Sequence, residues 1–364
     1  MAHTDSKTIG ILTSGGDCAG LNAAIRAVVA RAVLGYGWRV LGIHQGTMGL
    51  MRRPVECEEL DLSVTNVNVL RLGGTILGTT NKGDPFAFPM PDGSLKDRSA
   101  ELIEGARLAG LDAIVGVGGD GSFAILRRLA QQGGLNLVGI PKTIDNDVGA
   151  TEFSLGYDTA VSVATEALDR LQPTAASHDR VMILEVMGRD AGHIALAAGI
   201  AGGADIILIP EIPYTMKGIA AHIEKVRRQG RNFALVIVGE AVKDLTGRPV
   251  QRRQPGGGAS YGGIGYILGE AIADMTGAET RVTMLGHVQR GSPPTWNDRM
   301  AASAFGVHAV DLIAEGRFDR MVAWQNRRVV DVPLAEAIER PHEVDPYGAL
   351  VRTARGLGIS FGDE

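Results

Sequence analysis

Two short segments of this chain carry residue types that could act on a phosphate group. The first is Gly118-Gly-Asp-Gly-Ser122, which follows an apolar, β-rich run and precedes a helical pattern. Its glycines let backbone N–H groups approach an anion closely, and a helix that begins near Ser122 would point its first amides at the same anion. The second is Pro141–Asp147, which contains Asp145 and Asp147. A phosphate cradle and carboxylates within one βαβ unit predict phosphoryl transfer.

Asp120 lies among the donors of this predicted cradle. A carboxylate beside phosphates would repel them, so either it faces away from them or a divalent cation lies between, and we favour Mg²⁺ held by Asp120. An alternative interpretation is that the glycines form an ordinary tight turn and that Asp120 is the N-cap of the helix.

The same segment also fits a different class of enzyme. Gly116-x-Gly118-x-x-Gly121 matches the dinucleotide-binding fingerprint, which would indicate a nicotinamide-dependent oxidoreductase. That class places an acidic residue at the end of the next strand for the ribose hydroxyls. Here the strand Leu135–Ile140 ends in Pro141 and Lys142, so the partner of the fingerprint is missing.

A second glycine-rich loop, Thr13–Asn22, follows another predicted strand and opens another predicted helix. It aims a further set of backbone amides at an anion. The sequence contains no GxxxxGK[ST] pattern, which excludes the P-loop class of nucleotide hydrolases.

Thr143, Asp145 and Asp147 alternate along the chain. If the segment is extended, their side chains project to one side, and a carboxylate there could take the proton from an attacking hydroxyl, as a sugar kinase requires. The alternative interpretation is an Asx-rich turn after a strand.

Further polar residues follow later strands. Met187-Gly-Arg189 ends one, Glu240 ends the next, and Arg281 opens a strand that leads into Gly286-His-Val-Gln-Arg290. Arginines at strand ends indicate bidentate phosphate clamps, although a single one can equally form a surface salt bridge. His287 lies close to Arg290, which favours a ligand role over a hydrogen-bonded core position.

Composition narrows the class of protein. At 364 residues with 45% hydrophobic residues, the chain has material for two or three domains. The net charge of −5 and the 5% aromatic content argue against nucleic-acid binding. Cys18 and Cys57 are too few for a disulfide framework or zinc site. Residues 1–8 are polar and no apolar run is long enough to span a membrane, so we expect a cytoplasmic protein without a membrane partner.

Short apolar runs alternate with amphipathic stretches, which predicts parallel sheets covered by helices. Predicted strands are Thr8–Thr13, Trp38–His44, Ala113–Val117, Leu137–Ile140, Val181–Val186, Ile206–Ile209, Ala234–Val238 and Glu279–Leu285. Predicted helices are Leu21–Leu34, Arg98–Ala109, Phe123–Gln131, Asp158–Leu171, Gly192–Gly199, Lys217–Arg228 and Gly262–Met275. Surface loops are predicted at Lys82–Asp97, at Lys243–Tyr261 and in the tail after about Arg340. A boundary near residues 150–158 would separate two doubly wound α/β lobes.

With these pieces assembled, the chain resembles a 6-phosphofructokinase of the bacterial type from about Ile9 to Arg320. The resemblance rests on an ordered set of motifs: Ser14-Gly-Gly-Asp17, Gly73-Gly-Thr-Ile-Leu-Gly78, Gly118-Gly-Asp-Gly-Ser122, Pro141-Lys-Thr-Ile-Asp-Asn-Asp147, Met187-Gly-Arg189 and Gly286-His-Val-Gln-Arg290. It implies transfer of the γ-phosphoryl group of ATP, with Mg²⁺, to the 1-hydroxyl of fructose 6-phosphate. It also implies a donor lobe at 1–155 plus about 288–335, a sugar-phosphate lobe at 156–287 plus about 336–364, and an active site in the cleft between them.

The resemblance assigns roles to individual residues. Asp145 would be the general base, Thr143 would touch the transferring group and Arg189 would stabilise its charge, while Asp120 would hold the metal. The donor's phosphates would lie on Gly16, Gly119, Asp120, Gly121 and Ser122. The sugar phosphate would contact Thr143, Ile144, Asp145, Met187, Gly188, Arg189, Glu240, His287, Val288, Gln289 and Arg290. Arg180 and Arg281 would reach it from a neighbouring subunit, which implies a homo-oligomer, dimer or tetramer.

Two positions bear on the identity of the donor. Pyrophosphate-using relatives have Asp where this chain has Gly121, so Gly121 leaves room for ATP. Lys142 is typical of pyrophosphate users, whereas ordinary ATP enzymes of the family have Gly there. The combination resembles a mixed-substrate subgroup that depends on ATP despite the lysine.

The chain departs from the family pattern in two places. Asn81 and Lys82 replace an Arg-Phe pair that contacts the adenine nucleotide in familiar members. Of the basic effector-site residues Arg26 is retained, but the next aligns with Ala30 and the later lysines fall near Arg231 and Asn232, which argues against control by ADP or phosphoenolpyruvate. The alternatives to an ATP-dependent enzyme are a pyrophosphate-dependent phosphotransferase, the oxidoreductase and a non-catalytic sugar-phosphate-binding subunit. The intact trio Asp120, Thr143 and Asp145 argues against the last.

Overall fold

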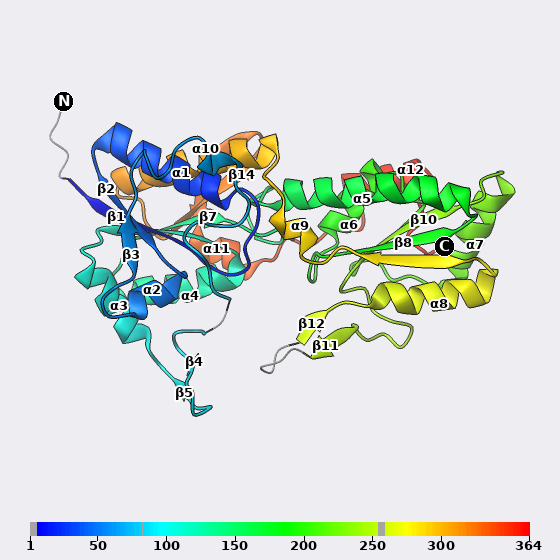
Figure 1. Ribbon diagram of the computed structural model, residues 1–364, viewed down its shortest axis with the longest axis horizontal. Coiled ribbons are helices and arrows are strands. Elements are labelled where there is room, and N and C mark those ends of the chain that lie inside the picture. Colours follow the sequence, from blue (N-terminus) through cyan, green and yellow to red (C-terminus); the bar gives the residue numbers. More distant parts are fainter. Residues whose placement is uncertain (1–5, 82, 254–258) are drawn as a thin grey trace. The chain divides into compact units, whose positions relative to one another are not determined.

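Figure 1 shows the computed structural model of the chain, in which residues 6–81, 83–253 and 259–364 are described. The chain divides into two compact units. Unit 1 comprises Met1–Asp158 and Arg290–His342, and unit 2 comprises Thr159–Gln289 and Glu343–Glu364. The polypeptide therefore crosses from one unit to the other three times.

Unit 1 is built on a seven-stranded sheet in the order β15-β14-β7-β6-β1-β2-β3. Strands β14, β7, β6, β1 and β2 are parallel, and the two outer strands pair antiparallel with their neighbours. The bounds are β1 (Thr8–Thr13), β2 (Arg39–Ile43), β3 (Cys57–Glu59), β6 (Ala113–Gly118), β7 (Leu137–Pro141), β14 (Arg320–Gln325) and β15 (Arg328–Pro333). Every residue of β6 and β7 is buried, as expected for central parallel strands covered on both faces.

Helices cover both faces of this sheet. In Figure 1, α1 and α10 lie on one face, and α2, α3, α4 and α11 lie on the other. The bounds are α1 (Leu21–Arg31), α2 (Thr47–Met51), α3 (Ser99–Leu108), α4 (Asp120–Gly133), α10 (Trp296–Ala314) and α11 (Leu334–Glu339), with a π-helical turn at Ala32–Tyr36 and a 3₁₀ turn at Val69–Arg71. In α4 the apolar spacing buries Phe123, Leu126 and Leu129, and Gly134 ends the helix in the left-handed region with a φ of 63°.

Unit 2 contains a four-stranded parallel sheet in the order β13-β8-β10-β9. The strand bounds are β8 (Val181–Val186), β9 (Ile206–Leu208), β10 (Ala234–Gly239) and β13 (Thr280–Met284). The helices are α5 (Tyr157–Ser177), α6 (His193–Ala201), α7 (Met216–Arg228), α8 (Ile264–Thr276) and α12 (Ala349–Gly356), and α9 (Val288–Gly291) contains the boundary with unit 1. Figure 1 shows α5, α6 and α12 on one face of this sheet and α7 and α8 on the other. The doubly wound α/β architecture with mainly parallel sheets is thus confirmed.

All eight predicted strands and all seven predicted helices are present, with ends that shift by a few residues. The largest element that the sequence analysis missed is α10, which packs against α1. The prediction of a loop after Arg340 is wrong, because α12 lies there and Ser360 bridges to Ile206 of β9. Only Val351 and Ala354 of α12 are buried, so its apolar pattern is too short to stand out in the sequence.

Two of the predicted loops contain short hairpins. Lys82–Asp97 includes β4 (Phe88–Pro89) and β5 (Leu95–Lys96), although Lys82 itself lies outside the described residues. Lys243–Tyr261 includes β11 (Gln251–Arg253) and β12 (Ala259–Tyr261), which pair antiparallel, and residues 254–258 lie outside the described part of the chain.

Candidate active site

The glycine-rich loops of unit 1 lie together because they follow three adjacent strands, β1, β6 and β7. Ser14 N–H, after β1, donates to the carbonyl of Val117 in β6 at 2.9 Å. Lys142 N–H, after β7, donates to the carbonyl of Gly118 at 2.9 Å. The carboxyl ends of parallel strands are where open α/β sheets bind ligands, and the loops of the predicted phosphate cradle lie together at these ends.

Helix α4 begins at Asp120, three residues before the predicted helix Phe123–Gln131. Gly119 is the N-cap, Asp120 and Gly121 form the first turn, and no side chain of the described residues caps this start. The interpretation of Asp120 as the N-cap is therefore wrong. The first amides of α4 have no acceptor within the helix and are left for an anion at its positive end.

Three glycines of the cradle have different reasons to be glycine. A Cβ at Gly118 would lie 2.6 Å from the Cβ of Ser122, and a Cβ at Gly16 would overlap the guanidinium of Arg290. A Cβ at Gly121 would meet no atom of the described residues within 4 Å. A side chain at Gly118 would thus displace the start of α4, one at Gly16 would displace the Arg290 guanidinium, and Gly121 borders open space beside the helix start.

Two cations fix the loop after β1. Lys142 is only 5% exposed, and its Nζ donates to the carbonyl of Gly16 at 2.7 Å. Burial lowers the pKa of Lys142. Nη1 of Arg290 donates to the carbonyl of Asp17 at 3.1 Å. Arg290 therefore lies against the donor loop of unit 1, although the resemblance assigned it to the sugar phosphate.

The carboxylate segment after β7 is held in a turn. Asp145 is 8% exposed, and its N–H donates to Oγ1 of Thr143 at 3.1 Å. Ile144 is buried, and Asn146 has a left-handed φ of 54°. The side chain of Asn146 accepts the N–H of Ser154 at 2.9 Å, which closes the turn. The segment is therefore not extended throughout, and its short-range turn bond is accepted by the hydroxyl of Thr143 instead of an Asx side chain.

The residues fit a magnesium ion of the kind that accompanies nucleotide phosphates. Within the described residues no three His, Cys, Asp or Glu side chains converge as a metal cage. Mg²⁺ is commonly held by one or two carboxylates together with substrate phosphates and water. Asp120, in the first turn of α4 beside the cradle, satisfies this requirement.

Unit 2 presents a second group of predicted residues at the carboxyl ends of β8 and β10. Arg189 has a left-handed φ of 51°, and its N–H donates to Oε1 of Glu240 at 3.1 Å. Met187 N–H donates to Oε1 of the fully buried Gln289 at 2.8 Å. A Cβ at Gly188 would lie 2.6 Å from the carbonyl of Ala191, so only glycine fits this bend.

The remaining predicted residues fall into two groups. His287 and Val288 are exposed after β13, on the same edge of the sheet as Arg189. Arg180 and Arg281 lie at the amino ends of β8 and β13, opposite the strand ends that carry Arg189, and both form ion pairs with Glu279. The six residues of β8 separate Arg180 from Met187, a span of about 20 Å. Within one chain, Arg180 and Arg281 therefore do not join the group around Arg189.

The sequence analysis missed three polar residues around the Arg189 loop. Glu211, after β9, accepts N–H groups of Gly192 and Val344 at 2.9 and 3.0 Å, and burial raises its pKa. Glu185, within β8, is 3% exposed and accepts two N–H groups at the start of α8. Tyr261, at the end of β12, donates to Asp190. Of these three residues, only Glu185 could have been singled out from the sequence, because it is an acidic residue inside an apolar strand.

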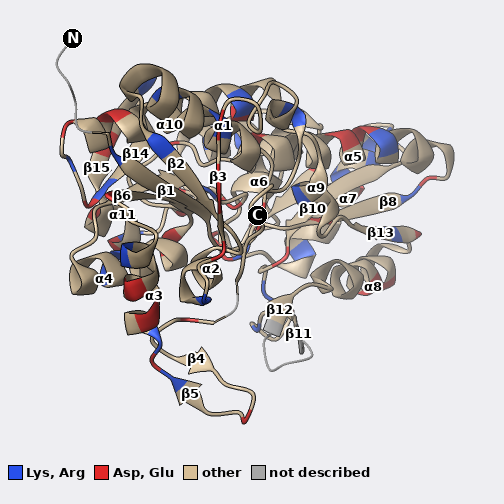
Figure 2. Ribbon diagram, turned by 60° about the vertical axis from the view of Figure 1, so that its left-hand side comes forward, with Lys and Arg blue, Asp and Glu red and all other residues tan. Residues whose placement is uncertain are grey.

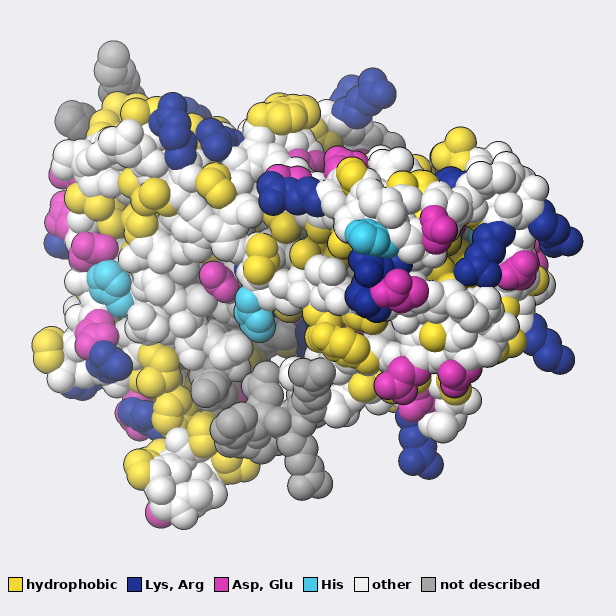
Figure 3. All heavy atoms as spheres, turned by 45° about the vertical axis from the view of Figure 1, so that its right-hand side comes forward, with side chains coloured by type: hydrophobic (Ala, Val, Ile, Leu, Met, Phe, Trp, Pro, Cys, Tyr) yellow, Lys and Arg dark blue, Asp and Glu magenta, His cyan; other side chains and the backbone are white. Residues whose placement is uncertain are grey.

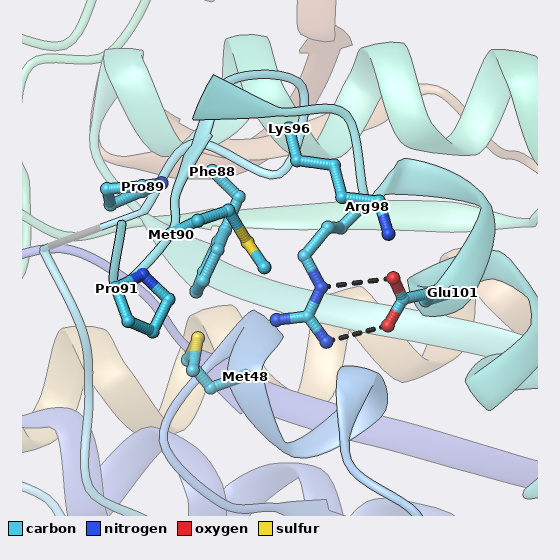
Figure 4. Close-up of a pocket in the computed structure, with 8 residues that line it drawn as sticks. All are labelled: Met48, Phe88, Pro89, Met90, Pro91, Lys96, Arg98 and Glu101. Atoms are coloured by element: carbon cyan, nitrogen blue, oxygen red, sulfur yellow. Dashed lines mark hydrogen bonds and ion pairs between the residues drawn. The ribbon is translucent and has the colours of Figure 1, made fainter. Parts of the chain in front are cut away.

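Hairpin β4–β5 borders a separate hollow of unit 1 (Figure 4). Apolar side chains form most of its wall, and Arg98 forms an ion pair with Glu101 on one side. The guanidinium of Arg98 also lies 4.8 Å from the ring centroid of Phe88. This guanidinium is therefore already engaged by a carboxylate and by an aromatic ring. The residues around it are Met48, Phe88, Pro89, Met90, Pro91, Lys96, Arg98 and Glu101.

Charges of both signs are mixed over the ribbons in Figure 2. On the face drawn in Figure 3, Lys and Arg side chains are likewise interspersed with Asp and Glu. Among the described residues, no helix has the length and apolar character needed to cross a membrane.

Comparison with known proteins places these motifs in one family. The family model described as phosphofructokinase matches residues 8–313. ATP-dependent 6-phosphofructokinase 1 of Synechocystis sp. is 62% identical over 359 residues, covering 98% of this chain and 99% of the relative. ATP-dependent 6-phosphofructokinase of Chloroflexus aurantiacus is 44% identical over 361 residues, covering 98% of each chain.

Solved structures agree with the fold. Phosphofructokinase from Saccharomyces cerevisiae has a TM-score of 0.77 at 30% identity, covering 92% of this chain and 45% of the yeast chain. A pyrophosphate-dependent phosphofructokinase from Marinobacter aquaeolei has a TM-score of 0.78 at 20% identity, covering 97% and 92%. The second likeness concerns the fold alone.

Proposed function

This chain belongs to the phosphofructokinase family, and we propose that it is an ATP-dependent 6-phosphofructokinase. In this proposal it transfers the γ-phosphoryl group of MgATP to the 1-hydroxyl of fructose 6-phosphate and forms fructose 1,6-bisphosphate. Unit 1 binds the donor, and unit 2 binds the sugar phosphate.

The open space at Gly121 is the observation that carries the choice of donor. The first turn of α4 offers uncapped amides, and no described atom lies within 4 Å of a Cβ at Gly121. A nucleotide's inner phosphate needs this room, whereas pyrophosphate ends before it. The named relatives that share 62% and 44% identity are described as ATP-dependent, which supports the same choice.

Asp145 acts as the general base. Its carboxylate is almost buried and follows directly on the cradle loops, so it can take the proton of the attacking hydroxyl without competition from bulk water. Thr143 orients this segment through its hydrogen bond to the Asp145 amide. Asp120 holds Mg²⁺, which neutralises charge on the donor's phosphates when bound.

Residues of unit 2 hold the acceptor. Arg189 stabilises the negative charge that develops on the transferring group. Glu240 accepts the N–H of Arg189, and Gln289 accepts the N–H of Met187. These hydrogen bonds fix the backbone from which the Arg189 side chain extends. Within unit 2, the sugar phosphate contacts Met187, Gly188, Glu240, His287, Val288 and Gln289.

Arg180 and Arg281 act on the sugar phosphate of a neighbouring subunit, so the enzyme is a homo-oligomer. Their position at the amino ends of β8 and β13, opposite Arg189, supports a role outside their own chain's site. The test mixes an Asp145→Asn subunit with an Arg180→Ala/Arg281→Ala subunit, each inactive alone. Recovered activity in mixed oligomers supports action across subunits, and none in verified hybrids contradicts it.

Pyrophosphate serves only as a weaker donor, as in a mixed-substrate enzyme. Lys142 favours this second activity because its buried ammonium lies at the cradle loop. The test is a coupled assay in which fructose 1,6-bisphosphate is measured with MgATP and with magnesium pyrophosphate in parallel. We expect ATP to be preferred, and activity with neither donor would refute the proposed function.

A further inference from the structure

Hairpin β11–β12 reaches the Arg189 loop through one side chain. The hydroxyl of Tyr261, the last residue of β12, donates to Oδ1 of Asp190 at 2.6 Å. This hydrogen bond raises the pKa of Tyr261, because loss of the phenolic proton would place two negative oxygens together. The contact links a segment that the sequence presents as a loop to the residue next to Arg189.

The structure fixes Tyr261 from both sides. In the hairpin register Tyr261 lies opposite Gln251, and Gly262 N–H donates to the carbonyl of Val250 at 3.2 Å. Two residues after Tyr261, Gly263 N–H donates to Oε1 of Glu185 at 2.8 Å. Glu185 also accepts the N–H of Gly265 at 2.8 Å and is buried in β8. The exit of the hairpin is therefore anchored to the strand that ends at Arg189's loop.

Asp190 in turn lies beside the guanidinium of Arg189. Its Oδ2 is 3.9 Å from Nε of Arg189, and both side chains are exposed. An exposed ion pair of this length between adjacent residues orders little by itself. A carboxylate whose other oxygen is held by Tyr261 is a fixed charge, and it restricts the directions that the guanidinium can take.

We propose that Tyr261 is a positioning residue for phosphoryl transfer, which holds Asp190 so that the Arg189 guanidinium is ordered before the sugar phosphate and donor meet it. This inference rests on the proposed function of Arg189. An arginine ordered in advance loses less side-chain entropy when it binds the transition state, so the effect falls on turnover. Binding of MgATP, assigned to unit 1, is unaffected.

The test replaces Tyr261 by Phe, which keeps the ring and removes the hydroxyl. We expect kcat to fall about 10-fold, with the KM for MgATP unchanged. Tyr266→Phe is the matched control, because Tyr266 lies on α8 of the same unit and is 52% exposed. The control keeps wild-type kcat. Asp190→Asn removes the charge at the other end of the contact and lowers kcat by a similar factor.

A double-mutant cycle separates positioning from a general structural role. If Tyr261 acts through Asp190, adding Tyr261→Phe to Asp190→Asn lowers kcat no further. Independent losses that multiply in the double variant overturn the inference, as does a Tyr261→Phe enzyme with normal kcat. Asp190→Asn tests the same contact if Tyr261→Phe fails to fold.

Amide hydrogen exchange gives a readout that does not depend on the reaction. The Arg189 N–H, which donates to Glu240, is expected to exchange faster in Tyr261→Phe than in the wild type and in Tyr266→Phe. Unchanged exchange contradicts the inference even if the protein has another activity. Inactivity of the wild type with MgATP and fructose 6-phosphate refutes the proposed function instead, so the two failures are distinguishable.

Discussion

The phosphate cradle of unit 1 and the Arg189 loop of unit 2 both present groups suited to bind negative charge, but they hold these groups in place in different ways. The cradle presents backbone amides and is stabilised from behind by Lys142 and Arg290. The Arg189 loop presents a side chain, and its own backbone is fixed by side chains from other segments. These are Glu211, Glu240, Gln289 and, through Asp190, Tyr261.

The difference indicates where each region tolerates change. In the cradle, space and backbone direction matter, because bound phosphates meet amides that every residue carries. In the Arg189 loop, a substitution that removes a distant carboxylate or hydroxyl leaves the loop sequence unchanged. It alters only the orientation of the loop residues. Substitutions should therefore have large effects on chemistry or donor choice in unit 1 and graded effects in unit 2.

The largest effect is expected at Asp145. Asp145→Asn keeps the size of the side chain but removes the base, so kcat should fall by about 10²–10⁴-fold. Steady-state assays with MgATP and fructose 6-phosphate measure this change. The exposed Asp169→Asn serves as a control with normal turnover. An Asp145→Asn enzyme with near-normal kcat would remove the proposed base and with it the chemical role of this turn.

The next largest effect is expected at Gly121. Gly121→Asp places a carboxylate in the space assigned to the nucleotide, and kcat/KM for MgATP should fall about 100-fold, or about 2.7 kcal/mol. The kcat/KM for pyrophosphate should fall by a smaller factor. Gly121→Ala is the matched control, because a Cβ there meets no described atom within 4 Å. Equal losses with both donors would mean that this space does not discriminate between them.

A smaller effect is expected at Lys142. Lys142→Met keeps the length of the side chain but leaves the Gly16 carbonyl without its donor, so the loop after β1 loosens. The KM for MgATP should rise about 10-fold, with a smaller change in kcat. Lys217→Met, at an exposed position in unit 2, is the control. An unchanged KM would show that Lys142 does not stabilise the cradle.

The smallest effect is expected at Glu211 and concerns stability. Burial raises its pKa in the folded state, so between the unfolded value near 4.5 and the higher folded value the folded chain binds more protons. The contribution of Glu211 to the free energy of unfolding is therefore fully present below its unfolded-state pKa. It is lost as pH rises through its folded-state pKa. The free energy of unfolding of Glu211→Gln, measured with urea at several pH values, should not show this decrease as pH rises. Parallel pH profiles for wild type and variant would contradict the assignment.

The sequence predicted the strands and helices around the cradle loops because the determinants of these elements are local. A strand, a glycine-rich turn and a helix follow one another in both loops, and adjacency of β1, β6 and β7 brings them together. A turn at Thr143–Asp147 was one of the two interpretations left open, but its closing contact from Asn146 to Ser154 was missed because the partner lies eight residues further on. The contacts of Glu211 and Tyr261 depend on Val344, Gly192 and Asp190, which no spacing or periodicity connects. Helix α10 was missed although its buried residues between Ala301 and Ile313 recur at a helical spacing.

The choice of donor is tested most directly by one measurement, the rate of fructose 1,6-bisphosphate formation by the purified wild type with MgATP and with magnesium pyrophosphate at saturating fructose 6-phosphate. The open cradle predicts a kcat/KM for MgATP at least about 100-fold higher. A preference for pyrophosphate, or product formation with neither donor, would contradict the account.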